Sequence, residues 1–139
     1  MSLSIRNQLA GTVSGVVPGE VMATVKTRLA GGQEITAAIT REAVDELALA
    51  GGSAVRVLIK STEVSLATGP VAGISIRNQL PGTVAEIATG GAMATVKLDI
   101  EGGALTAAIT REAVEDLGLT AGTPVVALVK STEISLATA

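Results

Sequence analysis

The chain of 139 residues contains the same unit of roughly 65 residues twice, and this duplication constrains its fold more than any other feature. The first copy opens on Ser4-Ile-Arg-Asn-Gln-Leu and the second on Ser75-Ile-Arg-Asn-Gln-Leu. The copies close on Lys60-Ser-Thr-Glu and Lys130-Ser-Thr-Glu. Two copies are too few for a solenoid, which needs about three stacked repeats. The sequence therefore predicts a tandem duplication of one small domain.

The repeat predicts a first domain at 1–68 and a second at 74–139, joined by a linker at 69–73 that contains Pro and Gly. A domain of this size buries only about 60% of its unfolded surface and is marginally stable alone. The chain has no Phe, Tyr, Trp, Cys or His, so its core must be built from small aliphatic side chains without disulfides. We therefore expect a homo-oligomer in which contacts between copies bury further apolar surface.

The missing residue types also exclude several kinds of chemistry. Without Cys or His there is no thiolate or imidazole nucleophile, no Ser-His-Asp triad, and no zinc or haem site of the usual kind. The acidic residues Glu42, Asp45 and Glu46 fall on the polar face of a predicted helix, which is an ordinary place for them and not a hydrolytic pair. We therefore expect a protein that is not an enzyme.

Charge and hydropathy indicate neither a nucleic-acid partner nor a membrane partner. The net charge is −3, and no aromatic side chain is present to stack on a base. The first residues lack the apolar core of a signal peptide, and no stretch approaches the about 18 apolar residues of a membrane span. We expect a cytoplasmic protein.

Alternating apolar and polar residues predict five strands in the first copy. They lie at residues 3–17, from residue 21 to the glycine pair at 31–32, and at 34–39, 55–59 and 64–66. Pro18-Gly19 and the glycine pairs at 31–32 and 51–52 provide the turns. Thr40 is a predicted N-cap for a short helix from Arg41 to Leu49. Three strands, a helix and two strands is the order of an OB-type barrel. The predicted fold class is all-β with one short helix per repeat, as two tandem OB-like five-stranded β-barrels.

Two cations that recur in both copies stand beside hydroxyl residues. Ser4 precedes Arg6 by two positions, on the same face of the predicted strand, and Ser61 directly follows Lys60. Cations and hydroxyls are the donors that suit a small oxyanion, and no carboxylate is adjacent to neutralise either charge. The alternative is a solvated strand face and an unremarkable strand junction, with Glu63 either solvated or paired with Lys60. Both interpretations stay open on the residues alone.

Three motifs resemble those of the molybdate-binding Mop domains, or molbindins. These are Ser-x-Arg-Asn near each domain start, Ile-Thr-Arg-Glu-Ala-Val in the middle, and Lys-Ser-Thr-Glu near the end. The likeness covers essentially the whole of both copies, so the chain resembles a tandem di-Mop molbindin. It contains no helix-turn-helix or Walker motif, so it does not resemble a complete regulator or a transporter ATPase.

The resemblance implies that a molybdate or tungstate oxyanion binds between two Mop domains of a homo-oligomer, with a trimer as the expected assembly. It implies that Ser4 and Arg6, with the Ile5 and Asn7 backbone, face Thr110, Lys130 and Ser131. The second set is Ser75, Ile76, Arg77 and Asn78 facing Thr40, Lys60 and Ser61. Several relatives have a Ser three residues after the Thr, where this chain has Ala43 and Ala113. Additional sites near a threefold axis are implied, but their residues are not assigned.

The expected function is therefore cytoplasmic binding, storage and homeostasis of molybdate and tungstate, without catalysis. The alternative is an interaction or regulatory module that senses the anion and signals to a partner protein. A partner that binds only in the presence of the ligand would favour the alternative.

Overall fold

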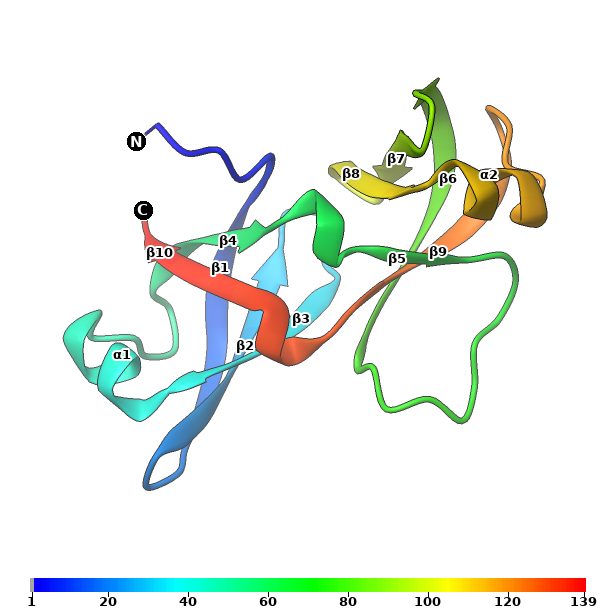
Figure 1. Cartoon of the computed structure of the whole chain (residues 1–139). Helices are drawn as coiled ribbons and strands as arrows, with labels where there is room; N and C mark the ends of the chain where they lie inside the picture. Colours follow the sequence, from blue (N-terminus) through cyan, green and yellow to red (C-terminus); the bar gives the residue numbers. More distant parts are fainter. Residues whose placement is uncertain (1) are drawn as a thin grey trace.

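The computed structural model describes residues 2–139 and shows two curved antiparallel sheets of five strands each (Figure 1). Met1, which the expected first domain includes, lies outside the described residues. The first repeat supplies β1 Asn7–Pro18, β2 Met22–Leu29, β3 Glu34–Thr40, α1 Arg41–Glu46, β4 Ala54–Ile59, the 3-10 turn η1 Ser61–Glu63 and β5 Ser65–Ala67. The second supplies β6 Asn78–Thr89, β7 Met93–Ile100, β8 Gly103–Thr110, α2 Arg111–Leu117, β9 Pro124–Val129, η2 Ser131–Glu133 and β10 Ile134–Thr138. The predicted all-β class with one short helix per repeat is confirmed.

The two repeats exchange their fifth strands. The sheet orders are β10-β4-β1-β2-β3 and β5-β9-β6-β7-β8, so each fifth strand pairs with the fourth strand of the other repeat. In Figure 1 the red strand β10 lies beside β4 of the first repeat. The sequence predicted the five strands but not this exchange, because strand order alone suggests a barrel built from one repeat. The chain leaves β4 toward the second sheet because η1 packs against β8, and η2 packs in the same way against β3.

The first strand is shorter than the sequence predicted. The ladder between β1 and β4 starts where Asn7 stands opposite Ile59, and β4 ends at that residue. Residues 4–6 therefore have no ladder partner and leave the sheet, so Ser4 and Arg6 do not share a strand face as expected. Within β1 the period of two is confirmed up to a bulge between Val13 and Gly15, after which the inward-facing position shifts.

The predicted N-cap is confirmed, but the helix is shorter than residues 41–49. The Thr40 hydroxyl accepts a hydrogen bond from the Ala43 N–H at 3.1 Å. The helix ends at Glu46 because Ala48 adopts a positive φ of 50° and the Leu49 N–H bonds back to the Val44 carbonyl. This hydrogen bond places Leu49 in the core, where it is buried beside Val44.

One apolar cluster extends across both repeats, which the strand exchange permits, and a second cluster lies within the first repeat. Val57 and Ile59 of the first repeat are fully buried in the same cluster as Val96 and Leu98 of the second. The β2–β3 and β7–β8 turns also meet, since the Gln33 side chain donates to the Glu101 carbonyl at 2.8 Å. No helix among residues 2–139 is long and apolar enough to span a membrane.

Candidate functional site

The register of β1 and β4 brings the Ser-x-Arg segment against the Lys-Ser segment of the same repeat. Asn7 and Ile59 form the last pair of the ladder, so Arg6 and Lys60 lie just beyond the sheet edge. A shallow cavity of about 270 Å³ opens at this point. It is lined by Ser4, Ile5, Arg6, Lys60, Ser61 and Thr62. The cations and hydroxyls that the sequence singled out in the first repeat therefore meet in space.

The second repeat has the equivalent register, with Asn78 opposite Val129 and therefore Arg77 and Lys130 beyond the sheet edge. The adjoining cavity is smaller, about 120 Å³. Its lining includes Ile76 and Lys130 of the second repeat together with Thr62 and Glu63 of the first. The two copies of the motif thus lie in different surroundings.

The grouping within one chain differs from the grouping that the resemblance implies. Ser4 and Arg6 lie with Lys60 and Ser61 of their own repeat, and not with Lys130 and Ser131. The reason is the ladder itself, because β1 pairs with β4 of the same repeat even though the fifth strands are exchanged. The sets that the resemblance places opposite each other therefore do not line this cavity together within one chain.

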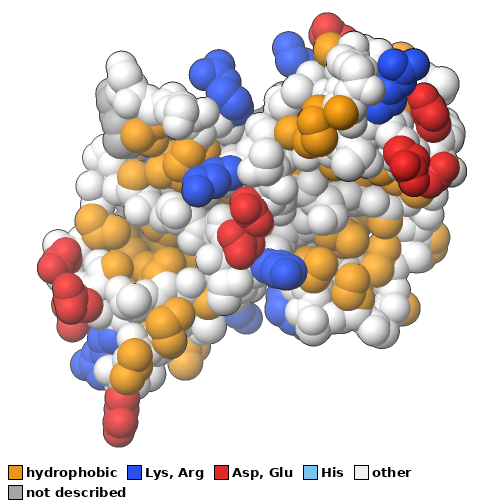
Figure 2. Space-filling view, viewed as in Figure 1, with side chains coloured by type: hydrophobic (Ala, Val, Ile, Leu, Met, Phe, Trp, Pro, Cys, Tyr) orange, Lys and Arg blue, Asp and Glu red, His pale blue; other side chains and the backbone are white. Residues whose placement is uncertain are grey.

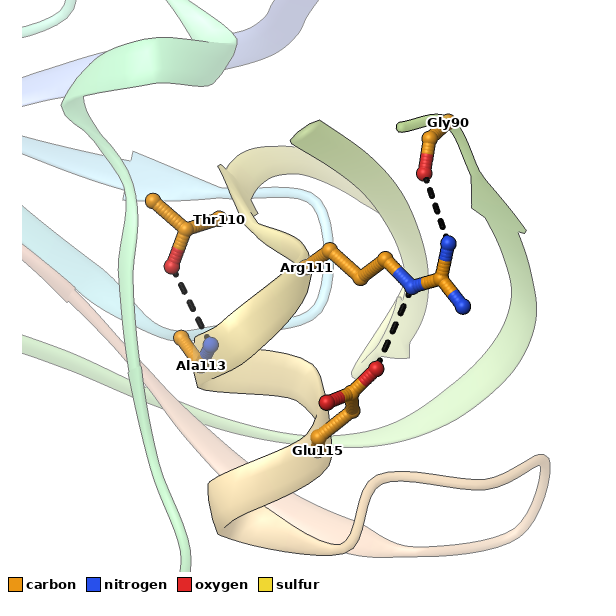
Figure 3. Close-up of polar contacts among 5 residues, drawn as sticks. All are labelled: Gly90, Thr110, Arg111, Ala113 and Glu115. Atoms are coloured by element: carbon orange, nitrogen blue, oxygen red, sulfur yellow. Dashed lines mark hydrogen bonds and ion pairs between the residues drawn. The ribbon is translucent and has the colours of Figure 1, made fainter. Parts of the chain in front are cut away.

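The two threonines also stand apart from these cavities within the chain. Thr40 borders a separate hollow beside the acidic face of α1. Figure 3 shows Thr110 at the start of α2, where its hydroxyl accepts the Ala113 N–H at 3.1 Å. Both hydroxyls therefore act as helix caps, and each still has its O–H available as a donor.

The hydroxyls of Ser61 and Ser131 are buried and have no hydrogen-bond partner among the described residues. A buried hydroxyl without a partner costs roughly 1–3 kcal/mol, and most such groups in proteins are satisfied. Here the same defect occurs in both copies, at the residue that follows the recurring lysine. In each copy, a buried hydroxyl donor beside a lysine therefore has no acceptor among residues 2–139.

Among residues 2–139, the lysines beside these serines have no carboxylate within ion-pair distance. The ion pairs within residues 2–139 join Arg41 to Asp45 at 4.0 Å and Arg111 to Glu115 at 3.1 Å, the latter shown in Figure 3. Glu63 does not pair with Lys60 in the described part of the chain, so that alternative has no support. The same residues contain no cluster of three or more His, Cys, Asp or Glu side chains that could hold a metal cation. The donor set is suited to an anion.

Sequence reasoning missed the role of the Asn in the Ser-x-Arg-Asn motif. The Asn7 side chain is buried and forms two hydrogen bonds of 2.8 Å, donating to the Thr106 carbonyl and accepting from the Thr106 N–H. Asn78 makes the same pair with Thr36, also at 2.8 Å. Each side chain therefore joins one repeat to the backbone of the other. A polar residue on the apolar face of a predicted strand was the signal that could have revealed it.

Comparison with protein-family models shows a match to the TOBE domain at residues 3–66 and again at 74–136. The chain is 39% identical over 99% of its length to the Molybdenum transport protein ModE of Herbaspirillum seropedicae, of which it covers 52%. It is 41% identical over 96% of its length to the Molybdenum-pterin-binding protein MopB of Rhodobacter capsulatus, of which it covers 50%. The chain thus spans about half the length of these relatives.

Among solved structures, the chain is similar to the cytoplasmic molybdate-binding protein ModG in a crystal form with molybdate bound. The sequences are 38% identical, the TM-score is 0.97, and the match covers 100% of both chains. The likeness therefore extends to both repeats and to their arrangement, and it confirms the resemblance to two-domain Mop proteins.

Proposed function

This chain belongs to the TOBE domain family, of which it contains two copies, and on that premise we propose that it is a cytoplasmic molybdate-binding protein without catalytic activity. The observation that carries the proposal is the pair of buried, unpartnered hydroxyls of Ser61 and Ser131 beside Lys60 and Lys130. The full-length likeness to ModG, whose structure contains molybdate, supports the choice of anion. Storage and buffering of the anion are the roles that such binding would serve.

The donors match the chemistry of molybdate, a tetrahedral dianion whose oxygens only accept hydrogen bonds. Transfer of a dianion out of water requires opposite charge and several donors, because an unpaired buried charge is very costly. Arg6 and Lys60 supply the charge, and Ser4 and Ser61 supply hydroxyl donors around one cavity. An anion that accepts from the Ser61 hydroxyl would also remove the penalty of that buried orphan.

We propose that a homo-oligomer, expected to be a trimer, completes each site. Thr40 and Thr110 do not line the two cavities that contain Lys60 and Lys130, so we expect a neighbouring copy to bring a threonine to each site. The tip of the β1–β2 hairpin exposes Val17 and Val21, which are 66% and 74% accessible. Apolar side chains appear at this surface in Figure 2, and contact with another copy would bury them.

Size and protonation give the expected order of anion affinities. Tungstate has nearly the size and charge of molybdate, so it is expected to bind almost as well. Sulfate is smaller, and its oxygens would lose contact with some donors of a cavity built for molybdate. Phosphate is partly protonated at neutral pH and would bring a donor to a cavity whose charged side chains, Arg6 and Lys60, can only donate.

Native mass spectrometry with molybdate, and with sulfate as the control anion, tests the proposal directly. The expected result is a discrete oligomer that takes up a fixed number of molybdates and ignores sulfate. The double variant Arg6→Ala/Arg77→Ala should lose this uptake and the ligand-induced rise in Tm. The matched control is Lys26→Ala/Lys97→Ala, which removes two exposed cations at equivalent positions of β2 and β7 and should bind normally. Equal uptake of sulfate, or normal binding by the arginine variant, would overturn the proposal.

A sensing module is the second candidate, because the chain is also 34% identical over 99% of its length to the Transcriptional regulator ModE of Yersinia pestis, of which it covers 53%. Such a module would pass the binding signal to another protein. A pull-down with and without molybdate separates the two candidates. A partner captured only with the anion would favour sensing, and no such partner would favour storage.

A further inference from the structure

In each repeat, a glutamine side chain donates a hydrogen bond to the backbone of the Ser-x-Arg segment. Gln8 lies on β1, and its side-chain amide donates to the Ile5 carbonyl at 3.1 Å. Gln79 donates to the Ile76 carbonyl at 3.2 Å in the same way. Residues 4–6 have no ladder partner, so this bond is the side-chain contact that ties the segment back to its strand.

The side chains of Gln8 and Gln79 differ in their hydrogen-bond partners. Arg56 of β4 donates to the Gln8 side-chain oxygen at 3.2 Å. A guanidinium can only donate, so it fixes the amide with its oxygen toward Arg56 and its NH2 toward Ile5. The position equivalent to Arg56 in the second repeat is Val126, since β4 and β9 pair with their partners in the same register.

Val126 cannot donate a hydrogen bond, so the Gln79 side-chain oxygen lacks the partner that Arg56 gives to Gln8, and the bond from its NH2 to the Ile76 carbonyl is not supported from β9. Gln79 is also exposed, whereas Gln8 is half-buried. Among residues 2–139, this series of hydrogen bonds, from Arg56 through Gln8 to the Ile5 carbonyl, therefore occurs in the first repeat and not in the second. It ends at a residue that lines the cavity with Arg6 and Lys60.

We propose that Gln8 and Gln79 are positioning residues for the Ser-x-Arg segments, and that Arg56 makes the site containing Arg6 the tighter of two unequal oxyanion sites. This proposal rests on the proposed function. Arg56 does not line the cavity, so its effect passes through Gln8. A segment held in its binding geometry before the anion arrives loses less conformational entropy on binding, and this raises its affinity.

The charge of Arg56 offers a competing explanation, because any nearby cation favours an anion. A double-mutant cycle separates the two explanations. If Arg56 acts through Gln8, Arg56→Val should weaken binding in the native background but not in a Gln8→Met background. If it acts by charge alone, the two effects should add. Arg28→Val is the control, because it removes another exposed cation of the same sheet, from β2 on the far side of β1.

The experiment measures molybdate binding by isothermal titration calorimetry of the full chain in backgrounds that retain one kind of site. Arg77→Ala leaves the site containing Arg6, and Arg6→Ala leaves the site containing Arg77. The first background should bind molybdate more tightly than the second. In the first background, Arg56→Val should weaken binding roughly tenfold, the low end of the loss seen when an outer-shell partner of a ligand is removed. In the second background, Val126→Arg should strengthen binding.

The possible results distinguish failure of the positioning role from failure of the proposed function. Equal affinities in the two backgrounds, no effect of Arg56→Val, or additive effects in the cycle would overturn the positioning role while leaving molybdate binding intact. A native chain that binds no molybdate would overturn the proposed function itself. The Tm of each variant without anion, expected to change little because Arg56 is exposed, shows that a lost affinity is not a lost fold.

Discussion

The cross-repeat asparagines allow a prediction with a magnitude that follows from the structure. The variant Asn7→Ala removes two hydrogen bonds of 2.8 Å and leaves the N–H and carbonyl of Thr106 without partners. Each buried polar group left unpaired costs about 1–3 kcal/mol. Because Thr106 is half-buried, we take the lower part of that range and expect a loss of about 2–4 kcal/mol in the free energy of unfolding.

The assay is thermal unfolding of the anion-free protein at one fixed concentration, since both anion and assembly shift the apparent stability. The expected loss corresponds to a fall in Tm of roughly 8–16 °C for a chain of this size. Asn78→Ala removes the equivalent bonds to Thr36 and should behave alike. Thr12→Ala on the same strand is the control, because Thr12 is exposed and should change stability by less than about 0.5 kcal/mol. Losses below about 1 kcal/mol for both asparagine variants would refute the reasoning.

Three further predictions concern the core, the meeting of the repeats and the exchanged strand. Thr27→Val should raise the free energy of unfolding by about 1 kcal/mol in chemical denaturation, because the Thr27 hydroxyl is buried without a partner in the described chain. Gly31→Ala should lower Tm, because its Cβ would collide with a backbone carbonyl of the opposing turn, whereas Gly15→Ala meets nothing and should leave Tm nearly unchanged. Truncation after Glu133 removes β10, and hydrogen exchange should then show lost protection in β4 of the first repeat, with β9 still protected. Lost protection in β9 instead would contradict the exchange.

The local elements were predictable from the sequence because their signals are local. Alternation of apolar and polar residues marked the strands, and Thr40 with the residues after it marked a capped helix. The strand exchange was not predictable, since the segment from Lys60 to Val64 is compatible with a return to its own sheet or a crossing to the other. The choice depends on how η1 packs against β8, which is a contact between residues far apart in the sequence. Pattern alone cannot supply it.

The candidate site was predictable in its residue types but not in its spatial grouping. Hydroxyls beside cations in both copies pointed to Ser4, Arg6, Lys60 and Ser61, and these four do line one cavity. The buried state of the Ser61 hydroxyl is a property of the packed turn and leaves no trace in the sequence. The participation of the Thr–Lys–Ser sets from another copy stays a prediction.

The location of the Lys-Ser segments links the proposed site to the exchanged strands. Lys60 and Ser61 lie where the chain leaves β4 of one sheet and crosses to β5 of the other, and Lys130 and Ser131 lie at the reverse crossing. An anion bound there would hold the two crossovers that interlock the repeats. Its binding free energy would therefore oppose separation of the sheets as well as dissociation of the oligomer. Hydrogen exchange of the amides in β5 and β10 reports local opening of these strands, and it should become slower when molybdate is added. Unchanged exchange in both strands would show that anion binding does not stabilise the strand exchange.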